Sequence, residues 1–199
     1  APFRSTVSVT DTPWNPDTQL VHIGIQGELP AVEDRPPLNL VFLIDTSGSM
    51  EHPDKLPLLK QSLALMLSKL SAQDQVSIVT YAGNAGVALP ATQGDQKSEL
   101  YEAIGRMQAG GSTAGARGIE LAYQIAQQQF DAEANNRVIL ATDGDFNVGA
   151  SSQGELVRLI EQRRDQGIYL TVLGFGTGNY QDGRMHRLAD HGDGNYYYI

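Results

Sequence analysis

Hydrophobic and polar residues alternate in two stretches near the start of the chain, residues 4–10 (RSTVSVT) and 19–29 (QLVHIGIQGEL). An apolar residue at every second position is typical of a β-strand with one apolar face. The segment between them, residues 11–17 (DTPWNPD), is rich in residues that form turns. The pattern predicts a β-hairpin that packs beside the main domain. We therefore expect residues 1–37 to form an N-terminal β-hairpin extension.

From residue 38 onward, short apolar runs alternate with segments of helical periodicity. The runs at 38–45 (LNLVFLID) and 137–145 (RVILATDGD) are typical of strands that are covered on both faces. Alternation of such strands with helices predicts an α/β domain over residues 38–199. Its expected fold is Rossmann-like and doubly wound, with a mainly parallel sheet and helices on both faces.

Three local patterns refine this prediction. Residues 85–92 (AGVALPAT) follow the preceding strand so closely that we expect an antiparallel edge strand. Residues 195–199 (NYYYI) are expected to close the chain as a second edge strand. Apolar residues at helical spacing over residues 54–70 predict a helix with Asp54 as its N-cap.

Composition narrows the classes of function. The 199 residues include 14 basic and 23 acidic side chains, a formal net charge of −9, without a basic cluster. This charge disfavours binding to nucleic acid or to an anionic membrane. The chain has no cysteine, which excludes disulfides and thiolate metal ligands. Its apolar runs are much shorter than the roughly 20 residues of a membrane span, so we expect no direct membrane insertion.

The candidate chemistry lies where the predicted buried strands end. Asp45 ends the first strand and begins the pattern Asp-x-Ser-x-Ser with Ser47 and Ser49, and Asp143 ends a second strand. Thr113 lies between them in a glycine-rich loop ahead of a helix. In open α/β sheets, ligands bind beyond the carboxyl ends of the strands. Carboxylate, hydroxyl and water oxygens suit a hard divalent cation, Mg²⁺ in particular, with Mn²⁺ or Ca²⁺ as alternatives. The protein supplies too few ligands to fill the shell, so we expect an open position that captures an Asp or Glu side chain of a protein partner.

The motifs DTSGSM, Thr113 and TDG resemble the metal-ion-dependent adhesion site of von Willebrand factor type A domains. This resemblance extends over residues 38–199 and implies that Ser47, Ser49 and Thr113 bind the ion through their hydroxyls. It also implies that the two aspartates act directly or through water. The phrase TDGDFNVG and the C-terminal segment are similar to a bacterial subgroup compared with calcium-activated chloride channel proteins. The subgroup implies a location in the bacterial cell envelope, whereas the absence of an apolar span argues against a channel.

Other interpretations of these residues stay open. Thr113 is also a suitable helix N-cap, Asp143 before glycine is a suitable turn residue, and we interpret Asp145 and Asn147 as loop structure. The alternative function is a Mg²⁺-dependent phosphohydrolase or phosphotransferase with Asp45 as nucleophile.

Three features of the sequence argue against this enzyme. A haloacid dehalogenase-like phosphatase would carry a second aspartate at the position of Ser47. We find no lysine near the site motifs and no histidine placed as a base. The sequence therefore predicts a binding module that is not an enzyme.

Overall fold

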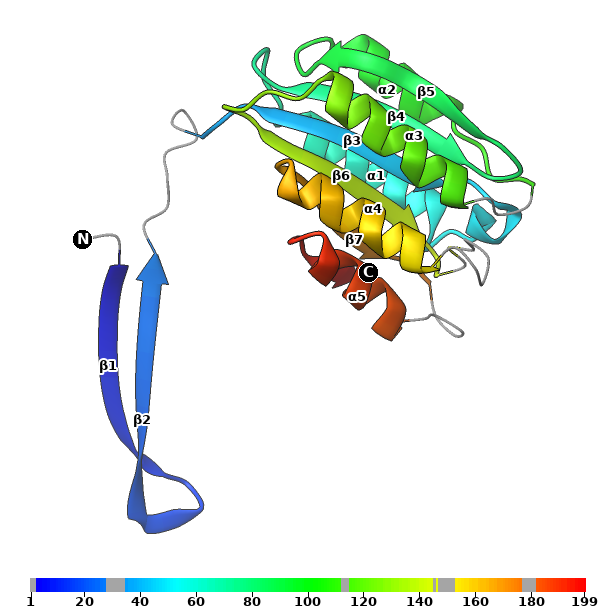
Figure 1. Ribbon diagram of the computed structural model, residues 1–199. Coiled ribbons are helices and arrows are strands. Elements are labelled where there is room, and N and C mark those ends of the chain that lie inside the picture. The colour runs from blue at the N-terminus through cyan, green and yellow to red at the C-terminus, as the bar shows by residue number, and fades with distance from the viewer. Residues whose placement is uncertain (1–2, 28–34, 112–114, 145, 147–152, 177–181) are drawn as a thin grey trace. The chain divides into compact units, whose positions relative to one another are not determined.

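The computed structural model describes residues 3–27, 35–111, 115–144, 146, 153–176 and 182–199. The chain forms two compact units, residues 1–35 and residues 36–199. Figure 1 labels most of the helices and strands of both units.

The first unit is an antiparallel hairpin of β1 (Phe3–Thr12) and β2 (Asn15–Gly27). Cross-strand partners in an antiparallel pair share a face, and Val7 pairs with Ile23 in this way. The apolar side chains of this face are exposed, Ile23 by 64%. The predicted N-terminal hairpin is confirmed, whereas its packing beside the other unit stays a prediction.

The turn of the hairpin is shorter than the expected segment of residues 11–17. The hydroxyl of Thr12 donates hydrogen bonds to the carbonyl oxygens of Asn15 at 2.6 Å and of Thr18 at 3.2 Å. These bonds satisfy backbone groups of the turn, so both strands extend into the segment that the sequence predicted as a connection.

The second unit contains a six-stranded sheet in the order β5-β4-β3-β6-β7-β8. Its strands are β3 (Leu38–Asp45), β4 (Gln75–Tyr81), β5 (Ala85–Gln93), β6 (Asn135–Thr142), β7 (Ile168–Gly174) and β8 (Tyr196–Tyr198). Every neighbouring pair is parallel except β4 and β5. The mainly parallel sheet with one antiparallel edge strand is thus confirmed, as is the placement of the last strand at the other edge.

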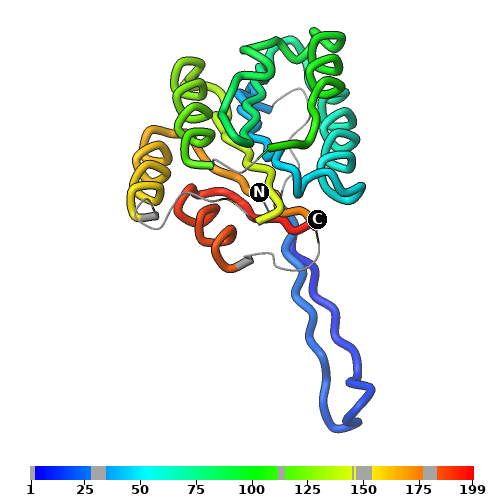
Figure 2. The backbone as a smooth tube through the Cα atoms, turned by 90° about the vertical axis from the view of Figure 1, so that its right-hand side faces the viewer, coloured from blue at the N-terminus to red at the C-terminus, as the bar shows by residue number. Residues whose placement is uncertain are grey.

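Helices cover both faces of this sheet and form one layer on each side of it (Figure 2). They are α1 (Leu56–Leu67), α2 (Lys97–Arg106), α3 (Gly115–Gln128), α4 (Gln153–Asp165) and α5 (Asp182–His191). Alternate residues of β3 point to opposite faces, so Phe42 packs with α1 and α2 while Leu43 packs with α3, α4 and α5. β3 is therefore buried on both sides, which explains its continuous apolar run. Among the described residues, no helix combines the length and the apolar character needed to cross a membrane.

The strand order reverses at β3: the next strands in the chain are added on one side of β3, and β6 and the later strands are added on its other side. β4 lies on one side of β3 and β6 on the other, and the helices that follow β3 and β6 belong to opposite layers. Connections that leave neighbouring strands toward opposite faces open a crevice at the carboxyl edge of the sheet. Asp45 is the last residue of β3 and Asp143 directly follows β6, so both lie at this crevice.

Candidate metal site

Asp45 is completely buried at the end of β3, and both of its carboxylate oxygens accept hydrogen bonds. The backbone N–H of Ser47 donates to Oδ1 at 2.8 Å. The hydroxyls of Tyr81 and Thr142 each donate to Oδ2 at 3.2 Å. Tyr81 and Thr142 are the last residues of the two strands that flank β3. Three neighbouring strand ends therefore hold this carboxylate in one orientation.

Burial raises the pKa of Asp45 above its ordinary value of 3.8, because desolvation disfavours the charged form. The hydrogen bonds from Ser47 act in the opposite direction and stabilise the carboxylate, while the charge on Asp143 again raises the pKa. Burial and the neighbouring carboxylate Asp45 also raise the pKa of Tyr81 well above its ordinary value, so its phenol stays a donor. The site thus concentrates negative charge on two carboxylates that are almost completely shielded from solvent.

The two serines of the motif come together in the turn that follows β3. Residues 48–51 form a short 3₁₀ turn, η2 (Gly48–Glu51), and the Oγ atoms of Ser47 and Ser49 lie 3.1 Å apart. Ser47 is buried and Ser49 is exposed. The backbone N–H of Gly48 donates to the carbonyl oxygen of Gly111 at 3.1 Å, which joins this turn to the glycine-rich loop.

Asp143 is paired with a lysine that the sequence did not indicate. The ammonium of Lys55 donates to Oδ2 of Asp143 at 2.8 Å and to the carbonyl oxygen of Ser49 at 3.0 Å. The Asp143 side chain is 3% exposed and the Lys55 side chain 20%. The expectation that no lysine lies near the site motifs was therefore wrong.

The start of α1 explains how Lys55 reaches the site. The sequence predicted Asp54 as the N-cap, but the helix begins one residue later with Lys55 in the N-cap position and without a side-chain cap. Asp54 instead pairs with His52, and Pro57 occupies the first turn, where its missing N–H costs nothing. Lys55 thus stands outside the helix, between the motif turn and the end of β6.

Three of the sequence candidates lie outside the described residues. These are Thr113, which we expect to be a metal ligand, and Asp145 and Asn147, which we interpreted as loop structure. The loop that leads to Thr113 is described as far as Gly111. The N–H of Gly110 donates to the carbonyl oxygen of Thr46 at 2.8 Å, so this loop lies beside the motif turn.

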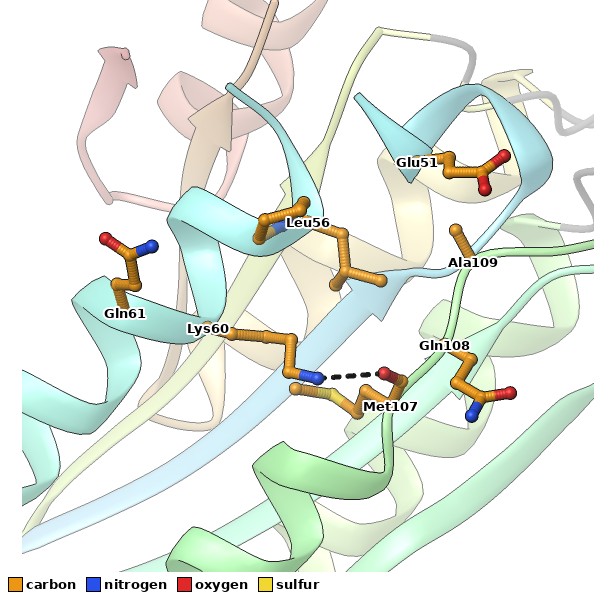
Figure 3. A pocket seen from close by; sticks show the side chains of 8 residues that line it. Glu51, Leu56, Lys60, Gln61, Met107, Gln108 and Ala109 are labelled. Carbon is orange, nitrogen blue, oxygen red and sulfur yellow. Dashed lines mark hydrogen bonds between the residues drawn. The ribbon is translucent and has the colours of Figure 1, made fainter. Parts of the chain in front are cut away.

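A pocket of about 540 Å³ adjoins the motif turn (Figure 3). Glu51 and Leu56 line it from the turn and α1, and Met107 lines it from the loop that leads to Gly110. The ammonium of Lys60 donates to the carbonyl oxygens of Gly105 and Met107 and holds this wall in place, as the dashed line in Figure 3 shows for Met107. A pocket with both apolar and polar lining residues thus lies directly beside the polar site.

Sequence reasoning missed Lys55, Tyr81 and Thr142. Tyr81 and Thr142 could have been found from a predicted strand order, because each is the last residue of a strand that neighbours β3. Lys55 gave no such signal, since its position depends on where α1 begins and how the turn before it folds.

The donor set fits a hard divalent cation. Ser47 and Ser49 bring two hydroxyl oxygens to within 3.1 Å of each other beside two carboxylates from neighbouring strand ends. Within the described part of the chain, His, Cys, Asp and Glu side chains do not gather in groups of three or more that could hold an ion. An ion at this place would therefore depend on the serine hydroxyls.

Comparison with known proteins places the fold in a family. The family model described as von Willebrand factor type A domain matches residues 39–199. The uncharacterized protein YfbK of Escherichia coli (strain K12) is 43% identical over 198 residues, which cover 100% of this chain and 34% of that protein. Inter-alpha-trypsin inhibitor heavy chain H4 of Sus scrofa is 30% identical over 156 residues, covering 74% of this chain and 16% of that protein. The chain thus spans about a third or less of these relatives.

Solved structures show the same fold. The von Willebrand factor type A structure from Catenulispora acidiphila has a TM-score of 0.71 at 22% identity and covers 91% of this chain and 41% of that one. The manganese-loaded TRAP protein of Plasmodium vivax has a TM-score of 0.65 at 19% identity and covers 82% of this chain and 68% of that one. The chain belongs to the von Willebrand factor type A domain family, which is known for metal-dependent adhesion and protein interaction.

Proposed function

We propose that this chain is a divalent-metal-dependent protein-binding module that captures an acidic side chain of a partner protein. Residues 38–199 form the binding domain and residues 1–37 its extension. Asp45, Ser47, Ser49, Thr113 and Asp143 hold the ion, which is Mg²⁺ with Mn²⁺ or Ca²⁺ as alternatives. When bound, the ion supplies a Lewis-acidic position for a carboxylate of the partner.

The observation that carries this proposal is the meeting of Ser47, Ser49 and two aspartates at one crevice. The hydroxyls lie 3.1 Å apart, and Asp143 is close enough for its charge to raise the pKa of Asp45. Family membership and the manganese in a protein of the same fold support a metal at such a place. The pocket that Glu51 and Met107 line lies where residues that flank the partner's carboxylate would contact the domain.

The geometry of Asp45 argues against the alternative of a phosphohydrolase or phosphotransferase. A nucleophilic carboxylate needs room for the phosphoryl group of the substrate beside it, whereas Asp45 is completely buried and accepts hydrogen bonds on both oxygens, which leaves access only for a group as small as an ion or a water. Lys55 does bring a positive charge to the site, but its ammonium is paired with Asp143. These contacts favour a role of the Asp45 carboxylate in binding over a role as nucleophile.

For the location, we propose the bacterial cell envelope. The basis is the resemblance to the bacterial subgroup, and the 43% identity to an Escherichia coli protein agrees with a bacterial context. Fractionation of cells that express the natural protein, followed by immunoblotting, tests this proposal.

Titration calorimetry with Mg²⁺, Mn²⁺ and Ca²⁺ tests the metal site directly. We expect binding by the unchanged chain and a loss of at least about 100-fold in affinity in Asp45→Ala, since two fixed carboxylates dominate the attraction. Ser62→Ala is the matched control, because Ser62 is exposed on α1 and donates to the carbonyl of Leu58 at 3.0 Å. Absence of a metal heat and of a thermal shift at millimolar Mg²⁺ would overturn the proposal.

Partner capture is tested by affinity purification from envelope extracts. A specific partner is expected with the unchanged chain in Mg²⁺, and it should be absent both with a chelator and with Asp45→Ala. A partner that persists in the chelator binds elsewhere on the chain and contradicts capture through the metal.

A further inference from the structure

We propose that Lys55 places a positive charge in the metal site, where this charge weakens the binding of the divalent ion and strengthens the attraction of the loaded site for the partner's carboxylate. This inference rests on the proposed function and assigns a role to a residue outside the predicted ligand set.

Lys55 is held against the site by two separate segments. Its ammonium lies 2.8 Å from Oδ2 of Asp143, which follows β6, and 3.0 Å from the carbonyl oxygen of Ser49, which belongs to the motif turn. The Asp143 side chain is 3% exposed, so solvent screens this charge pair weakly. A surface lysine would not be expected to keep one position in this way.

The backbone provides a slot for the lysine stem. Gly176 follows β7 with φ of +90°, a conformation that favours glycine, and a Cβ atom there would lie 2.5 Å from Cε of Lys55. The carbonyl oxygen of Gly176 accepts a hydrogen bond from the hydroxyl of Tyr198 in β8. The place of Lys55 is therefore shaped by the ends of β6, β7 and β8 together with the motif turn.

The formal charges of Asp45, Asp143 and Lys55 give the expected effect of Lys55 on the binding of a cation and of a carboxylate. Of these three described side chains, Asp45 and Asp143 bring two negative charges and Lys55 brings one positive charge, so the three together are −1 by formal count before an ion binds. A divalent ion changes this charge to +1, whereas the same site without the lysine would change from −2 to 0. Since like charges repel, the lysine lowers the affinity for the cation. Since the loaded site is then one charge more positive than it would be without the lysine, it attracts an anionic side chain more strongly.

A role in electrostatics predicts two changes of opposite direction from one substitution. Lys55→Gln removes the charge and keeps a donor for the carbonyl of Ser49. We expect Mg²⁺ to bind about tenfold more tightly by calorimetry, and acetate to bind the Mg²⁺-saturated protein severalfold more weakly in an NMR titration. Lys55→Arg keeps the charge and should change both affinities by less than about threefold.

Lys69→Gln is the matched control, because Lys69 is exposed and lies past the end of α1 that is remote from the site. It removes the same charge from the chain, so it corrects for the change in net charge. Both affinities should stay at the values of the unchanged chain.

Melting in a chelator gives a readout that needs no metal. Without the ammonium, the repulsion between the carboxylates of Asp45 and Asp143 increases, so the melting temperature of Lys55→Gln should fall by about 5 °C. Added Mg²⁺ should then stabilise this variant more than the unchanged chain. If Lys55→Gln does not fold in the chelator, restoration of the fold by Mg²⁺ supports the same role.

The outcomes separate this inference from the proposed function. Equal Mg²⁺ affinity in the unchanged chain and Lys55→Gln overturns the role of Lys55 and leaves the metal site in place. Binding by Lys55→Gln alone supports the role of Lys55 and overturns metal dependence of the unchanged chain. Absence of binding in both overturns both proposals. Tighter Mg²⁺ with unchanged acetate affinity contradicts the second half of the inference.

Discussion

The hairpin β1–β2 and the central strand β3 carry similar apolar residues in opposite surroundings. Ile23 of the hairpin is 64% exposed, whereas Leu43 of β3 is fully buried. Both belong to strands with regular pairing, Ile23 opposite Val7 and Leu43 between Val79 and Leu140. The difference lies in what covers the strands, since helical layers lie on both faces of β3 while the described hairpin residues form only two strands.

This contrast separates two properties that are often taken together. Alternation of apolar and polar residues is enough to indicate a strand, but stability requires that a second layer covers the apolar face. It also explains why the polar site is built on β3, because a carboxylate at the end of a doubly covered strand is held by neighbouring strand ends. Asp11 in the hairpin is exposed by comparison, and its carboxylate accepts a hydrogen bond from the side-chain amide of Gln19 at 3.4 Å.

The largest difference between the regions should appear in the core. Leu43→Ala should lower the free energy of unfolding by about 3 kcal/mol, because it removes buried methyl groups and leaves a cavity. Ile23→Ala should change it by less than about 0.5 kcal/mol, since its side chain is already in water. Urea denaturation measures both values. A loss of similar size in Ile23→Ala would show that the hairpin face is covered in solution.

A smaller difference in stability is expected between substitutions of Asp45 at the end of β3 and of Asp11 in the hairpin, both measured in a chelator. Burial raises the pKa of Asp45, so the folded chain holds its proton more tightly than the unfolded chain. The resulting stabilisation is full below the ordinary value of 3.8 and is lost as the pH rises through the raised pKa. Asp45→Asn abolishes this loss and should raise the free energy of unfolding at pH 7 by on the order of 1 kcal/mol.

Asp11→Asn is the control for this comparison, and its effect should stay within about 0.5 kcal/mol because Asp11 is exposed. Thermal melts of the three proteins between pH 4 and pH 8 give the full profiles. If the melting temperatures of the unchanged chain and of Asp45→Asn fall in parallel as the pH rises, the loss of stability does not come from Asp45.

The smallest expected effect comes from removing residues 1–35. The second unit contains its own core on both faces of the sheet, so it should still unfold cooperatively, with a melting temperature within about 3 °C of the full chain. A peptide of residues 3–27 should be largely unfolded by circular dichroism, because two strands without a covering layer are marginal. A fall of about 10 °C on removal would show that the hairpin contributes to the stability of the domain.

Much of the fold follows from local patterns in the sequence. The doubly covered strand at 38–45, the close antiparallel partner at 85–92 and the edge strand at the C-terminus were predicted, since periodicity and spacing depend on neighbouring residues alone. The residue at which helix α1 begins was harder to predict. The sequence favoured Asp54 as a cap, but the turn after Ser49 brings His52 and Asp54 together and starts the helix after Lys55.

For the candidate site, the sequence by itself determined where chemistry could gather. It placed Asp45 and Asp143 at strand ends and the two serines in the turn between β3 and α1, because strand direction brings carboxyl ends to one edge. Only the tertiary structure decided that Tyr81 and Thr142 hold the carboxylate of Asp45 and that Lys55 lies on Asp143. These contacts join residues 36, 97 and 88 positions apart. Such distances are set by how strands and helices pack, and no local pattern encodes them.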